Sequence, residues 1–334
     1  MWLLLAFVSA ALLGFYDTSK KAALENNAVL PVLLLNTFFS TLIFSPFIID
    51  SIAGTGWFAG TILDSSPFAG HPETSGEAAR ILKGDGISSA GAAGPAGYMD
   101  SHPLLKAHLL VILKSCIVLT SWIFGYFGLK HLPITIVGPI NATRPILVLV
   151  GAMLLFGERL NAWQWAGVIL AMVSLFLLSR SSKRENVDFS HNRWIWFIAA
   201  ATIAGALSGL YDKYIMGMLG PMFVQSWYNF YQFIMMGAVI LILWLPKRKT
   251  TTPFHWSMAI PFISIFISAA DFAYLSALNQ PDSMISVVSL VRRGSVIISF
   301  LCGALLFRER NLKAKALDLA FILAGMVFIW LGSR

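Results

Sequence analysis

Long apolar stretches separated by short polar connections dominate the chain. A helix needs about 20 apolar residues to cross the hydrocarbon core of a bilayer. Short hinges such as Leu132-Pro133 and Gly220-Pro221 lie between several stretches, as expected because proline cannot continue a helix. The pattern predicts an all-α polytopic membrane protein. Its ten expected transmembrane helices are residues 2–22, 29–49, 108–129, 133–156, 162–179, 194–217, 221–245, 255–278, 283–307 and 315–332.

One long segment, residues 50–106, interrupts this pattern. It is rich in Gly, Ala, Ser and Pro, and no part of it is long or apolar enough to cross a bilayer. We expect an extramembrane insert with a short interfacial helix near Glu77–Leu82. At the start of the chain there is no positively charged region of the kind that opens a signal peptide, so we expect no cleaved signal.

The composition supports a membrane protein. Hydrophobic residues make up 57% of the 334 residues and charged residues only 12%, whereas soluble domains carry about 25% charged residues. This balance excludes a single soluble core, a disordered chain and a nucleic-acid module, despite the net charge of +8. Cys116 and Cys302 both lie inside apolar stretches, so they indicate no disulfide framework.

The chain contains an internal duplication. The segment Ala11–Asp17 is similar to Ala206–Asp212, and Gly151–Arg159 is similar to Cys302–Arg310. These matches fall at corresponding positions and indicate two copies of a five-span unit. Because five is odd, the second copy enters the membrane inverted relative to the first, as in many secondary transporters. The expected units are residues 1–180, a basic linker at 181–193, and residues 194–334.

The distribution of basic residues predicts an orientation. Of the 24 Lys and Arg residues, fourteen lie in the odd-numbered connections between spans, and six lie on the other side, which includes both termini and the insert. Cytoplasmic loops carry the excess of Lys and Arg. The charges therefore place both termini and residues 50–106 outside the cytoplasm.

A short motif follows the fourth span of each copy. A Leu/Phe-rich helix with small residues ends in Gly-Glu-Arg-Leu at 157–160 and in Arg-Glu-Arg-Asn at 308–311. With ten spans in two repeats, the chain resembles the EamA-type transporters of the drug/metabolite transporter superfamily. The resemblance implies secondary transport but no particular substrate, since that superfamily carries amino acids, sugars, nucleotide sugars, choline and drugs. The chain differs from that family in its insert and in its charge distribution, since family members usually have both termini in the cytoplasm.

Ionisable groups inside the spans are functional candidates, because they are costly in a bilayer. For Lys114 the alternative is that its long stem reaches the interface. The alternative for Asp17 is a local pair with Lys20 or Lys21. Candidates for coupling are Asp271, Lys114, Asp17 and Asp212.

Three arginines also lie within the spans. For Arg144 the alternative to a functional role is a purely structural ion pair with Asp271. Arg292 and Arg293 point about 100° apart on a helix, so one could line a cavity while the other packs against a helix or reaches an acid.

Polar side chains share faces of several predicted helices, because residues three and four apart lie on one side. One such face holds Asp282, Ser286, Ser289 and Arg293, and a shorter one holds Asn36 and Ser40. Hydrogen bonding between helices is the alternative explanation. If these faces converge, they enclose a polar cavity with aromatic walls. The expected substrate-binding residues are Arg144, Asn141, Arg293, Arg292, Tyr228, Asn229, Gln232, Gln225, Trp122, Tyr126 and Asn36.

These features predict a secondary active transporter, for efflux or exchange, in the inner membrane of a bacterium. We expect an amphipathic or organic metabolite whose anionic group pairs with Arg144 or Arg293, since Arg matches carboxylate and phosphate bidentately. Asp271 could couple transport to protons, because a carboxylate in a low-dielectric cavity takes up a proton more readily unless a cation pairs with it. The expected partners are this small molecule and membrane lipid.

Other function classes have less support. There is no phosphate-binding glycine loop, so transport would not use ATP. No histidine pair has metal-ligand spacing and no hydrolase motif occurs, so we expect no enzyme, no metal and no cofactor. The open alternative is a non-transporting membrane scaffold, or a flippase for a lipid-linked substrate, with residues 50–106 as a docking surface.

Overall fold

The chain forms a bundle of helices in a computed structural model. The structure describes residues 1–24, 27–61, 63–68, 103–131, 140–141, 143–180, 193–248, 252–295, 297–298, 301–302 and 312–332, with backbone alone at 21, 126, 129–130, 174–180, 247, 312–319 and 322. Within these ranges every regular element is a helix, which confirms the all-α class.

The helices follow the apolar stretches of the sequence. After α10, a π-helical turn η1 (Ile240–Trp244) and a 3-10 turn η2 (Leu245–Lys247) continue the same rod. The α-helices are α1 (Trp2–Leu24), α2 (Val29–Ala53), α5 (Pro103–His131), α7 (Arg144–Leu155), α8 (Ala162–Arg180), α9 (Arg193–Met216), α10 (Pro221–Val239), α11 (Ala259–Leu278), α12 (Ile285–Arg293) and α14 (Leu312–Gly332).

Six of these helices are long and apolar enough to cross a membrane. They are α1, α2, α9, α11, the Pro103–Gly125 part of α5, and α10 together with η1. Shorter apolar helices lie at Arg144–Leu155, Ala162–Val173 and Leu323–Gly332. The protein is therefore an integral membrane protein, and in the described part six of the ten expected spans meet this length and hydropathy.

Turns interrupt two of the expected spans. We expected a helix over 133–156. Ile140 and Asn141 are helical, a turn follows at Thr143, and α7 begins at Arg144, while residues 132–139 and 142 lie outside the described ranges. We expected 283–307 to be one helix, but α12 ends at Arg293, and residues 295, 297–298 and 301–302 are helical again after a turn at Gly294. There the N–H of Gly294 donates to the Val291 carbonyl at 2.9 Å, which tightens the last turn. The short interfacial helix expected near Glu77–Leu82 and residues 181–192 of the expected linker also lie outside the described ranges.

The beginning of the expected insert is folded against the end of α2. Gly54 takes a left-handed conformation (φ 62°), which ends α2 four residues later than expected. The Asp50 carboxylate then accepts hydrogen bonds from the hydroxyls of Thr55 and Ser65. The insert is therefore shorter than 50–106 at both ends, since α2 and α5 extend into it.

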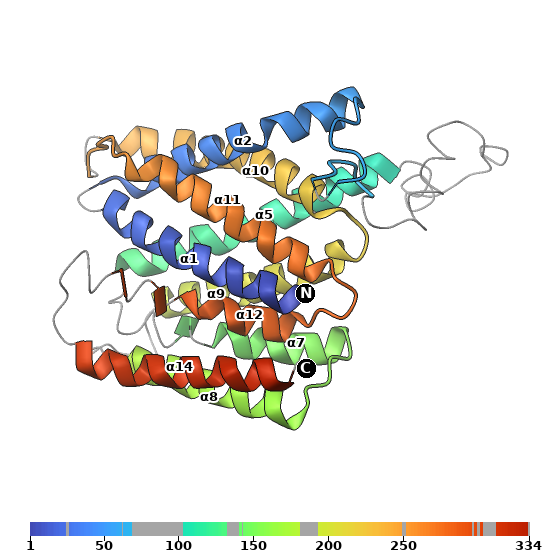
Figure 1. The fold of residues 1–334 in the computed structure, drawn as a ribbon. Coiled ribbons are helices and arrows are strands. Elements are labelled where there is room, and N and C mark those ends of the chain that lie inside the picture. Colours follow the sequence, from blue (N-terminus) through green and yellow to red (C-terminus); the bar gives the residue numbers. More distant parts are fainter. Residues whose placement is uncertain are drawn as a thin grey trace.

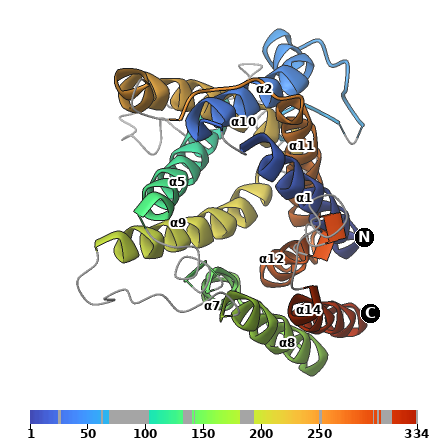
Figure 2. The same cartoon turned by 90° about the vertical axis from the view of Figure 1, so that its left-hand side faces the viewer.

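The helices pack in a definite set of pairs. α1 lies along α11, α5 along α9, α2 along α10, and α8 along α14. α2 and α10 lie at the top of Figures 1 and 2, and α8 and α14 lie at the bottom. Both termini lie at the same end of the bundle (Figure 1), as expected for an even number of crossings.

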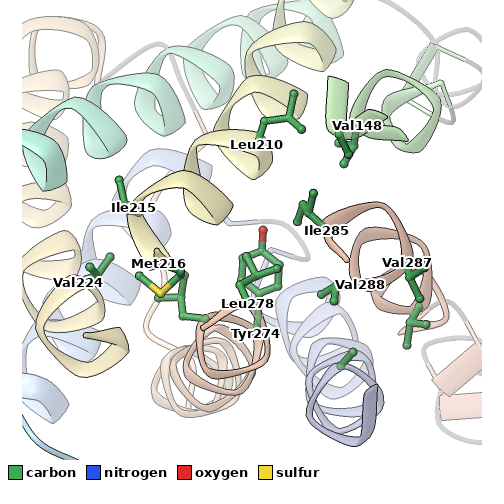
Figure 3. Close-up of a cluster of buried hydrophobic side chains, with 14 of the residues drawn as sticks. Val148, Leu210, Ile215, Met216, Val224, Tyr274, Leu278, Ile285, Val287 and Val288 are labelled. Carbon is green, nitrogen blue, oxygen red and sulfur yellow. The ribbon is translucent and has the colours of Figure 1, made fainter. Parts of the chain in front are cut away.

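Buried apolar side chains join α7, α9, α11 and α12 in the middle of the bundle (Figure 3). Leu210 of α9 faces Val148 of α7, and Tyr274 lies between α9 and α12. Many large apolar side chains instead face outward, including Leu154 and Trp196. Soluble proteins rarely expose so much apolar surface, whereas a bilayer requires it.

The crossing of α8 and α14 depends on glycine. A Cβ on Gly167 would lie 2.6 Å from the carbonyl oxygen of Gly325. Small residues let the backbones of two membrane helices approach closely in this way. This contact connects the last helix of the first half with the last helix of the second.

Candidate functional site

A cavity of about 470 Å³ lies among the helices of the bundle. Its volume falls within the range of about 300–1,000 Å³ that is typical of small-molecule sites. Side chains from α1, α2, α5, α7, α9, α10, α11 and α12 line it. The expected site residues that line it are Asp17, Asn36, Lys114, Trp122, Arg144, Asp212, Gln225, Tyr228, Asn229, Gln232, Asp271, Arg292 and Arg293.

Two expected residues are not among the cavity residues. Asn141 is exposed, and its amide oxygen accepts a hydrogen bond of 3.0 Å from Thr202 on α9. The side chain of Tyr126 lies outside the described part. Asn141 therefore does not line the cavity with Arg144, and a turn at Thr143 separates it from the start of α7.

A buried ion pair joins α5 to α9 at the cavity wall. Lys114 pairs with Asp212, and their side chains are only 6% and 8% exposed. The Lys114 ammonium also lies 4.9 Å from the ring centroid of Tyr228. The alternative in which Lys114 reaches the membrane interface is therefore wrong. Because a buried charge needs its partner, this pair fixes the two helices relative to each other.

A second ion pair joins α11 to α12. Arg292 pairs with Asp271, and the guanidinium lies 4.2 Å from the ring centroid of Tyr274. Asp271 thus pairs with Arg292 and not with Arg144, which corrects the alternative considered from the sequence. A proton-coupling role for Asp271 requires this pair to separate during transport.

The other two arginines of the cavity have no acidic partner within the described residues. Arg144 donates to the carbonyl of Gly205 at 2.6 Å. Arg293 makes no hydrogen bond or ion pair to any residue that the structure describes. Among the described residues, five cations and three acids line the cavity, which leaves an excess of two positive charges. The cations are Lys20, Lys114, Arg144, Arg292 and Arg293, and the acids are Asp17, Asp212 and Asp271.

Polar groups of α2 and α10 divide into two sets. The first set joins helices: the Ser268 hydroxyl donates to that of Ser40 at 3.2 Å, and Thr41 donates to the Asn229 carbonyl at 3.0 Å. The second set consists of buried side-chain amide atoms of Asn36, Asn229 and Gln232 that have no hydrogen-bond partner among the described residues. A buried polar atom without a partner costs about 1–3 kcal/mol, so these amides require an explanation other than helix packing.

The motif after α7 positions the start of α12. Gly157 takes a left-handed conformation (φ 63°) and ends α7. Glu158 then accepts hydrogen bonds from the backbone N–H groups of Ile285, at 2.6 Å, and Ser286, at 3.2 Å. A carboxylate at a helix N-terminus satisfies free N–H groups and is favoured by the helix dipole. Thus a residue of the first half holds the helix that carries Arg292 and Arg293.

This contact changes the expected polar face of α12. Ser286 donates to Glu158, whereas Ser289 and Arg293 line the cavity. Only the second half of that face therefore belongs to the site.

Sequence reasoning missed several cavity residues. Tyr274 lies one helical turn after Asp271 on α11, and Tyr16 directly precedes Asp17. Both tyrosines could have been predicted by considering the residues next to each charged residue and one helical turn away from it. Gly205 gave no signal, because its importance depends on a side chain from another helix.

We expect Gly205→Ala to lower transport at least tenfold. An added Cβ would lie 2.5 Å from the Cζ of Arg144, so the guanidinium would have to leave its place against α9. Gly209→Ala is the matched control, because it lies one turn further along the same cavity wall and its Cβ would meet no atom closer than 3.8 Å. Substrate exchange into liposomes measures both variants. Equal loss of exchange in the two variants would contradict the role given to Gly205.

Comparison with known proteins supports the resemblance found in the sequence. Residues 88–180 match the model of the EamA-like transporter family, which belongs to the drug/metabolite transporter superfamily. This range contains Lys114, Arg144 and Glu158. No curated protein matches the chain at a significant level.

Solved structures share the fold. One crystal structure aligns over 100% of this chain and 98% of its own, with a TM-score of 0.67 at 14% sequence identity. At this identity the likeness concerns the fold alone. The whole described bundle therefore follows an arrangement already seen in another protein.

Proposed function

We propose that the protein is a secondary active transporter, working by efflux or exchange, and that a small organic metabolite passes through the cavity between its two halves. The observation that carries this proposal is the cavity itself. It lies inside a bundle of membrane-length helices and has an excess of two positive charges. Charge of this kind is costly in a membrane and usually marks a substrate or ion pathway.

The helix contacts support two inverted five-helix repeats. If α1, α2, α5, α7 and α8 are exchanged with α9, α10, α11, α12 and α14, the main contacts map onto one another. The pair α1–α11 becomes α9–α5, α2–α11 becomes α10–α5, and α7–α9 becomes α12–α1, while α2–α10, α7–α12 and α8–α14 map onto themselves. Such a pattern is expected of two similar units related by a two-fold axis, with substrate bound between them.

Alternating access would then exchange which side of the bundle opens to the cavity. The ion pairs Lys114–Asp212 and Arg292–Asp271 each join two helices at the cavity wall. Rocking of one repeat against the other would change the separation of Lys114 and Asp212, which lie on helices of different repeats, so this pair is a natural point of control for opening. Arg292 and Asp271 both lie in the second repeat and would move together.

Exchange of metabolites in reconstituted liposomes tests this function. Purified protein is placed in vesicles loaded with a cell extract, and mass spectrometry identifies the compounds whose movement requires the protein. We expect at least one small organic compound to move, saturably and against its own labelled form. If no compound moves in protein-containing vesicles beyond protein-free ones, transport is contradicted.

A deletion distinguishes transport through the cavity from the two alternatives that use residues 50–106 as a docking surface, namely a scaffold and a flippase. The deletion removes residues 70–98, which leaves the contact between Asp50 and Ser65 intact. A transporter that works through the cavity should keep its exchange activity. Loss of exchange in this folded variant would favour the insert as the functional surface.

A further inference from the structure

Three buried side-chain amides form one wall of the cavity, and each has atoms without a hydrogen-bond partner in the part of the chain that the structure describes. Asn36 of α2 is 5% exposed, and Asn229 and Gln232 of α10 are 7% and 1% exposed. The atoms without partners are Asn36 Oδ1, Asn229 Nδ2 and both Oε1 and Nε2 of Gln232. All three residues line the cavity. The wall therefore offers hydrogen-bond donors and acceptors together, and no charge.

Packing between helices does not account for this wall. The seams of α2 with α10 and α11 already have hydrogen bonds of their own, through Thr41 to the Asn229 carbonyl and through Ser264 to the Asn36 carbonyl. In Asn36 and Asn229 the backbone carbonyl accepts the hydrogen bond between helices, so the side-chain amide remains available to a ligand in the cavity. Buried polar groups in native proteins nearly always have partners, so the partner of this wall is expected in the cavity.

The charged wall comes from other helices. Arg144 lies on α7 and Arg293 on α12, and neither has an acidic partner among the described residues. α2 and α10 lie in the upper part of Figure 2, whereas α7 and α12 lie in its lower part. The cavity thus has a cationic pole and a neutral, hydrogen-bonding pole on different helices.

We propose that the cavity binds an organic anion that carries hydroxyl or amide groups away from its charge. Its carboxylate or phosphate would pair with Arg144 and Arg293, since guanidinium binds both bidentately. Hydroxyl or amide groups of the ligand would bind the amides of Asn36, Asn229 and Gln232, because such groups also donate and accept. This inference rests on the proposed transport function and specifies its substrate class.

Matched pairs of ligands test the inference on the full-length protein in detergent. Each pair has the same charge with or without hydroxyls: gluconate against hexanoate, and glucose 6-phosphate against hexyl phosphate. Glucose is the uncharged comparison. Ligand-induced thermal stabilisation gives an apparent affinity for each. We expect a hydroxylated anion to bind at least about tenfold more tightly than its unhydroxylated partner, as expected for one additional satisfied hydrogen bond. It should also bind at least about tenfold more tightly than glucose, which lacks the anionic group that pairs with the two arginines. The two pairs distinguish a carboxylate from a phosphate ligand.

Variants of the amide wall assign the preference to these residues. In the double variant Asn229→Leu and Gln232→Met, which keeps side-chain volume, we expect the tenfold preference to fall to less than twofold while the unhydroxylated anions still bind. Ser226→Ala is the control, since Ser226 is buried on α10 but donates to the Met222 carbonyl of its own helix. This control should keep the preference.

The outcomes separate the inference from the function. A wild-type protein that binds both members of each pair equally, or a double variant that keeps the preference, overturns the inference. Since binding is measured without transport, these results do not depend on whether substrate exchange is observed. Exchange that fails while the ligand preference holds would instead contradict the proposed function.

Discussion

Lys114→Met is expected to destabilise the folded protein by about 3–5 kcal/mol. The variant leaves the Asp212 carboxylate buried on α9 without its cation, where its side chain is only 8% exposed. Removal of one partner of a buried ion pair costs far more than the pair contributes, because the remaining charge has lost both water and its partner. The apparent melting temperature of purified protein in detergent should fall by several degrees.

A double-mutant cycle isolates the pair. Lys114→Met combined with Asp212→Leu removes both charges, so we expect the double variant to be more stable than either single variant. Asp271→Asn provides a comparison at the second ion pair, where the side chains of Arg292 and Asp271 are 19% and 24% exposed. Water in the cavity solvates this pair better, so its loss should lower stability less. A double variant no more stable than the singles would show that Lys114 and Asp212 do not stabilise each other.

The membrane-spanning character of the chain could be predicted from its hydropathy, because a bilayer imposes a length and a composition on every helix. The ends of α7 and α12 could not. Apolar residues continue on both sides of Arg144 and Arg293, but the backbone turns at Thr143 and Gly294. Hydropathy does not record such local turns, because the residues involved are apolar or small.

Neighbouring positions on one helix could be predicted, whereas partners across helices could not. The angle between Arg292 and Arg293 predicted that they would differ, and Arg292 indeed reaches Asp271 while Arg293 has no acidic partner among the described residues. Lys114 lies 98 residues from Asp212. No local pattern connects them, since the contact exists only once α5 packs on α9. Glu158 and the start of α12 meet for the same reason.

Arg144→Gln and Arg293→Gln are each expected to lower exchange of the substrate at least tenfold, and the double variant is expected to abolish it. Together these two guanidiniums equal the positive excess of the cavity, and among the described residues neither is neutralised by an acid. Loss of one partner of a buried charged contact with a ligand costs about 2–5 kcal/mol of binding. Exchange in liposomes and the apparent melting temperature are measured on the same preparations.

The comparison of substitutions separates charge from geometry. Arg144→Lys keeps the positive charge but loses the planar guanidinium, so it should recover only part of the activity if the anion is bound bidentately. Arg159→Gln removes an equal charge from an exposed position outside the cavity and should leave exchange unchanged. Thermal stability should stay near that of the unmodified protein in the Arg293 variant, because Arg293 makes no hydrogen bond or ion pair to the described residues. Arg144→Gln should lower it modestly, because it also removes the hydrogen bond from α7 to the Gly205 carbonyl of α9. Undiminished exchange by both glutamine variants would mean that the cavity does not recognise its substrate by charge, and the positive excess would then need a purely structural explanation.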